Sequence, residues 1–191
     1  MRAAWLFVAA GALAFVPIFV YDLLSLRTGR RSWVLFVSGG ALLTAATAGL
    51  LFAADLPDSC KARPAGCALC LAAAAAMLFF LVKALFFSFP PAQGYAGGGR
   101  APAVTSGLYA LCRHPGVLFL GGFYLFVWLA APCWPLFAAF ALFTALDTVL
   151  AFYEDCAVFP ALLDGYTTYR HTTPFLLPDK ASFLRACRKT R

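Results

Sequence analysis

The residues that decide the fold are 115–146, which read PGVLFLGGFYLFVWLAAPCWPLFAAFALFTAL and contain no charged side chain. One continuous helix of that length would exceed the apolar core of a bilayer, which is roughly 30 Å thick. Near the middle stands Pro132-Cys133-Trp134-Pro135, and proline interrupts helical hydrogen bonding. The stretch therefore predicts a tight hairpin of two helices, over about 116–131 and 136–152, both short enough to sit tilted in the membrane.

Three more apolar runs precede the hairpin, over 3–21, 32–54 and about 67–87. Asp22 and the basic loop after it are expected to end the first span, and the polar loop 55–63 to end the second. The prediction is an all-α polytopic membrane protein with about five transmembrane helices, a short C-terminal helical hairpin and a cytoplasmic tail. Residues 1–191 would form one membrane domain, with three spans in 1–87 and the loop, hairpin and tail in 88–191.

Composition agrees with this fold class. The 191 residues are 63% apolar and only 12% charged, with a mean hydropathy of +0.83, whereas soluble domains are about 45–50% apolar and about 25% charged. A soluble enzyme, a disordered chain and a disulfide-rich secreted scaffold are therefore excluded as leading interpretations. The net charge of +7 lies in short loops and the tail, which indicates contact with membrane lipids and not with nucleic acid.

The distribution of basic residues predicts the orientation. Five spans place the two termini on opposite sides of the membrane. Eleven Lys and Arg residues then fall on the side of the C-terminus, and only Arg2, Lys61 and Arg63 fall on the other. Because cytoplasmic loops carry the excess of Lys and Arg, we expect a multi-pass integral membrane protein with its C-terminus in the cytoplasm.

The seven cysteines include a Cys67-x-x-Cys70 motif at the start of the third span. A zinc site would need further ligands, but the only histidines, His114 and His171, are predicted on the opposite side. We therefore expect no metal. Packing within the helices is the favoured role of these cysteines, and a redox pair or a disulfide with Cys60 stays open.

Chemistry-bearing residues gather at the two outer ends of the predicted hairpin. Residues 105–116 include TSGLY and RHPG, and the second arm leaves the membrane at Glu154-Asp155. Antiparallel folding would make the positions near 115 and 153 neighbours. The sequence therefore predicts a polar pocket at headgroup level, covered by the Pro- and Gly-rich loop 88–107 and by the tail.

These residues together resemble a known family. The pattern TSG-x-Tyr at 105–109, Arg-His-Pro at 113–115, the acidic pair at 154–155, Tyr166-x-x-Tyr169 and prolines at 174 and 178 is similar to the isoprenylcysteine carboxyl methyltransferase family and its bacterial membrane relatives. The resemblance covers about residues 100–178.

The resemblance implies an integral membrane methyltransferase that uses S-adenosylmethionine and acts on a lipidic, isoprenoid-like or prenylated acceptor at the cytoplasmic face. It implies catalytic residues at Arg113, His114 and Glu154. It implies a cofactor site formed by Val104, Tyr109, His114, Pro115, Gly116, Val117 and Glu154. Residues expected near the acceptor are Asp147, Leu150, Tyr166 and Tyr169.

The properties of the side chains give these positions roles and alternatives. Glu154 would accept hydrogen bonds from an ammonium or a ribose, and Arg113 would hold a carboxylate or a lipid phosphate. Tyr166 and Tyr169 would close the pocket or anchor the tail at the interface. Asp147 would face the acceptor or form a buried pair with Lys83.

Two rival interpretations remain. Sterol reductases share an Arg-His-Pro-like segment and use NADPH. The chain also differs from the methyltransferase pattern at Val117, Leu150 and Leu163, which leaves open an inactive structural or transport-associated membrane protein.

Overall fold

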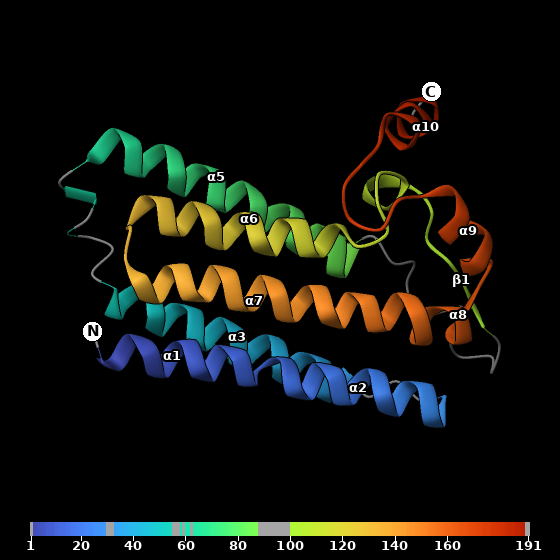
Figure 1. Ribbon diagram of the computed structural model, residues 1–191, viewed down its shortest axis with the longest axis horizontal. Coiled ribbons are helices and arrows are strands. Elements are labelled where there is room, and N and C mark those ends of the chain that lie inside the picture. The colour runs from blue at the N-terminus through green and yellow to red at the C-terminus, as the bar shows by residue number, and fades with distance from the viewer. Residues whose placement is uncertain are drawn as a thin grey trace.

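The computed structural model describes residues 2–29, 33–54, 58, 60, 61, 63–87 and 100–189. Its long helices run side by side along the longest axis, and the C-terminal elements gather at one end (Figure 1). Four described segments are long and apolar enough to cross a membrane: Arg2–Thr28, Trp33–Ala53, Pro64–Phe87 and Trp134–Leu162. The apolar helix Pro115–Ala130 is shorter. The expectation of an all-α protein with membrane-type helices is confirmed at this level.

The first segment consists of two helices, α1 (Arg2–Leu13) and α2 (Phe15–Thr28), separated at Ala14. Pro17 explains the interruption, because its ring conflicts with the carbonyl four residues earlier. Asp22 and the basic loop after it were predicted to end this span, and the helix passes Asp22 and ends within that loop. Asp22 is buried, and the helix ends at Gly29, where a φ of 66° suits a residue without Cβ.

The next two long helices are α3 (Trp33–Ala53) and α5 (Pro64–Val82), and a π-helical turn, η1 (Lys83–Phe87), extends α5. A disulfide joins Cys60 to Cys67, whose Cα atoms are 5.2 Å apart. It fastens the preceding loop to the first turn of α5. Of the alternatives open for these cysteines, the structure contains the disulfide with Cys60, and Cys70 is a free cysteine.

The predicted hairpin is present as α6 (Pro115–Ala130) and α7 (Trp134–Tyr153), which pack against each other. Pro115 and Pro135 each stand in the first turn of a helix, where a missing N–H costs nothing. The second arm is longer than expected. α7 ends at Tyr153, close to the predicted end near residue 152, but the chain continues through a π-helical turn, η4 (Glu154–Val158), into α8 (Phe159–Leu162), which the sequence did not predict.

The core between the helices contains buried Leu50, Tyr124, Leu136 and Phe143. Glycine permits close approach, since a Cβ on Gly11 would lie 2.3 Å from the Phe143 ring. Small residues serve the same purpose in membrane helix packing.

Elements from the segment before α6 and from the tail after α8 together form a cap at one end of the bundle (Figure 1). They are β1 (Ala101–Pro102), the 3₁₀ turn η3 (Gly107–Ala110), β2 (Leu163–Asp164), α9 (Tyr166–Thr172) and α10 (Lys180–Lys189). β1 pairs in parallel with β2, with Ala101 opposite Leu163. The loop predicted to cover the pocket lies mostly outside the described residues, which resume at Arg100.

Candidate functional site

The candidate site lies where the beginning of α6 meets the end of α7. His114 is the residue before α6, and Glu154 begins the π-helical turn that follows α7. His114 Nδ1 lies 3.6 Å from a Glu154 carboxylate oxygen. The prediction that the hairpin brings these two residues together is confirmed.

Asp155 is the centre of the polar network at this site. Its side chain is 2% exposed, and its Oδ1 lies 2.9 Å from Arg113 Nε. Its Oδ2 lies 3.2 Å from Arg170 Nε, and the hydroxyl of Tyr166 donates to Oδ1 at 2.6 Å. One carboxylate therefore joins the start of α6 to α9. Charge-assisted hydrogen bonds of this kind are about twice as strong as neutral ones.

Arg113 is occupied by groups of the chain itself. Besides Asp155, its guanidinium donates to the carbonyls of Arg170 and Thr173, the latter at 3.2 Å. Its backbone N–H donates to the carbonyl of Pro174 at 2.9 Å. In the described residues Arg113 therefore holds the tail in place. The predicted role in holding a carboxylate ligand would require these contacts to open.

His114 is enclosed between aromatic rings. Its ring stacks on Phe159 at a centroid distance of 5.7 Å and meets the edge of Phe175 at 5.1 Å. Its Nε2 is buried, lies 3.6 Å from Asp155 Oδ1 and makes no hydrogen bond within the described part of the chain. Burial lowers the pKa of His114, and Asp155 opposes that effect. The imidazole is therefore biased toward its neutral form, which can accept a proton.

Glu154 shares His114 with Asp155, but its other neighbours differ. Its carboxyl lies within hydrogen-bonding reach of Asp22 and close enough to Asp147 to interact electrostatically. The side chain of Glu154 is 23% exposed, so part of it is open to a ligand.

The tyrosines predicted at the site are brought together. Tyr166 and Tyr169 are buried, so they pack inside the cap, and the interpretation as exposed interfacial anchors was wrong. Tyr169 donates to the carbonyl of Tyr109 at 2.6 Å. Tyr109 donates to the carbonyl of Ala84 at 3.3 Å, which links η3 to the end of α5. Burial is the main reason that the pKa values of all three are raised.

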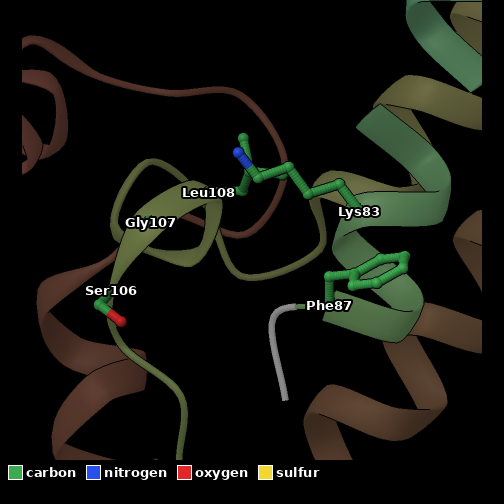
Figure 2. Close-up of a pocket in the computed structure, with 5 residues that line it drawn as sticks. All are labelled: Lys83, Phe87, Ser106, Gly107 and Leu108. Carbon is green, nitrogen blue, oxygen red and sulfur yellow. The ribbon is translucent and has the colours of Figure 1, made fainter. Parts of the chain in front are cut away.

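A cavity of about 340 Å³ lies beside this network, at the lower end of the usual size for small-ligand sites. It is lined by Lys83, Phe87, Ser106, Gly107 and Leu108, and Figure 2 shows Lys83 reaching across toward Leu108. Ser106 and Gly107 belong to loop 88–107, which was predicted to cover the site, whereas Lys83, Phe87 and Leu108 were not predicted to line it. This cavity, between the end of α5 and η3, is therefore not the hollow that was predicted between His114 and Glu154.

Other predicted positions lie around the network without adding a contact to it. Pro115, Gly116 and Val117 form the first turn of α6, where Val117 is buried. Val104 follows the β1 strand and is half-buried. Leu150 is buried within α7. The alternative of an ion pair between Asp147 and Lys83 was wrong, because no salt bridge joins these two described residues.

Sequence reasoning missed the roles of Asp22, Asp155 and Arg170. Only Glu154 of the acidic pair was predicted as a site residue, and the sequence does not indicate which of two adjacent acids faces an arginine. Asp22 carried one usable signal. Leu23, Leu24 and Leu26 after it are apolar, and that pattern is typical of a helix that continues.

No family model matches the chain, and the comparisons with curated proteins and with solved structures give no match either. No group of three or more metal-ligating side chains occurs within the described ranges.

Proposed function

We propose that this chain is an integral membrane methyltransferase that uses S-adenosylmethionine and modifies a lipidic acceptor. The observation that carries the proposal is the 3.6 Å approach of His114 to Glu154 at one end of the helical bundle. It joins two halves of a sequence pattern that are far apart in the chain and that resemble the isoprenylcysteine carboxyl methyltransferases.

The residues present fit part of what the cofactor requires. Glu154 is partly exposed and offers acceptor oxygens for an ammonium or ribose hydroxyls. Tyr109 links η3 to the end of α5 through the carbonyl of Ala84, and Lys83 brings a positive charge to the cavity wall. Arg113 does not fit the carboxylate-binding role while Asp155 occupies it.

S-adenosylmethionine, when bound, supplies an electrophilic methyl group whose transfer leaves a neutral thioether. The acceptor atom forms the new bond to carbon as the carbon–sulfur bond breaks. A carboxylate or thiolate acceptor needs no base. An alcohol or amine would lose a proton, and the neutral imidazole of His114 is suited to take it.

The proposed orientation places this end of the bundle in the cytoplasm. It has five spans, which are the four long segments and the shorter helix α6. Two features support it. The basic residues are concentrated in the tail and neighbouring loops. The Cys60–Cys67 disulfide lies at the start of α5, at the end of the bundle away from the cap. Disulfides persist in oxidising compartments.

A calorimetric titration of the detergent-purified protein with S-adenosylmethionine tests the proposal. Binding is expected, with at least a tenfold loss in Glu154→Gln. Asp58→Asn is the matched control, because Asp58 pairs only with exposed Lys61 among the described residues. Transfer of labelled methyl groups into a lipid extract and a panel of prenylated thiols would then identify the acceptor class.

The second candidate function is a structural membrane protein without catalysis. It is favoured by the closed contacts of Arg113 with Asp155 and the tail. Binding of neither S-adenosylmethionine nor NADPH would support it, and binding of NADPH alone would support a reductase.

A further inference from the structure

The C-terminal helix α10 (Lys180–Lys189) is oriented with its apolar side chains outward. Ser182 is fully buried and Ala186 half-buried, and this small-residue side packs toward η3. Phe183 is 58% exposed and Leu184 is 50% exposed. A helix on a soluble protein normally turns its apolar stripe to the core, so α10 presents the opposite arrangement.

This orientation is fixed by the chain itself. Ser182 and Asp179 form reciprocal hydrogen bonds at the start of the helix, with Ser182 N–H donating to the Asp179 carboxylate at 2.6 Å and Asp179 N–H donating to the Ser182 hydroxyl at 3.1 Å. Arg185 donates to the carbonyl of Thr172, which ties the helix to the end of α9. The hydrogen bonds between Asp179 and Ser182 and the bond from Arg185 therefore hold the helix with its apolar side outward.

The direction of α10 suits a membrane surface. In Figure 1 the long helices lie lengthwise across the view, whereas α10 is seen nearly end-on at the same end of the molecule as the cap. It therefore runs across the direction of the spans. If the spans cross a bilayer, α10 runs along the plane of that bilayer, at the level where the helices end.

The charge of α10 specifies the kind of surface. The helix contains Lys180, Arg185, Arg188 and Lys189 and no acidic residue. Exposed Leu177 precedes it by three residues. Basic amphipathic helices with large apolar side chains lie in the headgroup region of anionic membranes, and each Lys or Arg near such a surface adds about 1 kcal/mol.

We propose that α10 is an interfacial helix that inserts Phe183 and Leu184 among the headgroups of anionic phospholipids beside the bundle. The bilayer that holds the spans is the surface in reach, and its negative charge complements the helix. Because α10 packs on η3, which lines the cavity, its binding to lipid holds the cap against the membrane. This proposal needs the bundle to lie in a bilayer but does not depend on methyl transfer.

Hydrogen exchange of the full-length protein in nanodiscs tests the proposal. A helix of this length is marginal in water, so its amides report on binding. Exchange over residues 180–189 is expected to slow at least tenfold when phosphatidylcholine discs include phosphatidylglycerol at about one third of the lipid. High salt should reverse most of this slowing, because it screens the charges.

The double substitution Phe183→Ser/Leu184→Ser should abolish the slowing, and Ala181→Ser, at an exposed position on the same helix, should retain it. Amides of α6 and α7 serve as the folding control in every sample. Equal exchange in both kinds of disc would overturn the proposal. So would slowing that depends on protein concentration in lipid-free detergent, because a second copy would then cover the helix.

Discussion

The two ends of the helical bundle are held together by different chemistry. At one end the Cys60–Cys67 disulfide fastens a short loop covalently to α5. At the other, one buried carboxylate, Asp155, holds Arg113, which precedes α6, and Tyr166 and Arg170, which both lie in α9. A covalent link constrains a loop whatever surrounds it, whereas the charge network depends on burial and on every partner being present. The capped end should therefore be the more sensitive to substitution and to pH.

Removing the carboxylate at the capped end should have the largest effect. Asp155→Asn leaves Arg113 without its buried counter-ion, and breaking a buried pair costs about 3–5 kcal/mol. We expect a lower thermal midpoint in detergent, measured as alkylation of buried Cys112 on heating.

The matched control is Asp58→Asn at the other end, where Asp58 and Lys61 are exposed and such pairs contribute about 0–1 kcal/mol. If the two substitutions lower the midpoint equally, the contrast between the two ends is wrong.

Removing the disulfide should have the next largest effect. Cys60→Ser opens a loop with a sequence separation of 7, for which the chain-entropy account gives about 2–3 kcal/mol. Without reductant, only Cys60 and Cys67 should resist alkylation in the unfolded wild-type protein. Cys70→Ser is the control and should leave stability unchanged. A wild-type protein in which Cys60 alkylates freely would show that this end is held in another way.

A smaller loss is expected when one neutral hydrogen bond is removed from the cap. Tyr169→Phe removes the bond to the carbonyl of Tyr109, and such a bond contributes about 1 kcal/mol. Thermal midpoints would be compared with those of Tyr153→Phe, whose hydroxyl makes no hydrogen bond to a described residue. A loss as large as that of Asp155→Asn would mean that Tyr169, and not the carboxylate, organises the cap.

Lowering the pH should also reduce stability. Burial lowers the pKa of His114 below its unfolded value of 6.5, so below pH 6.5 the unfolded chain binds a proton that the folded chain does not. Stability should therefore fall as pH decreases from 6.5 to 5, by at most about 1.4 kcal/mol per pH unit. His114→Gln should flatten this profile, and His171→Gln should not. An unchanged slope in His114→Gln would assign the effect to other groups.

Prediction from sequence succeeded where one local property decided the outcome. The charge-free runs located the long helices, because a bilayer tolerates few charges at its centre. The prolines at 132 and 135 located the hairpin, because proline stops one helix and is accepted in the first turn of the next. The end of α7 at Tyr153 was predicted closely, but its continuation through η4 was missed, because a π-helical turn has no simple sequence signal.

The sequence by itself determined that this chain is a set of apolar helices and that positions 114 and 154 meet at one end of a hairpin. Only the tertiary structure decided how the two adjacent acids divide their partners, Asp155 facing the arginines and Glu154 facing His114, Asp22 and Asp147. Neighbouring residues on a helix point about 100° apart. The rotation of that helix against α2 and α6, and the extra residue in its π-helical turn, therefore set which acid meets which partner, and no local pattern encodes either.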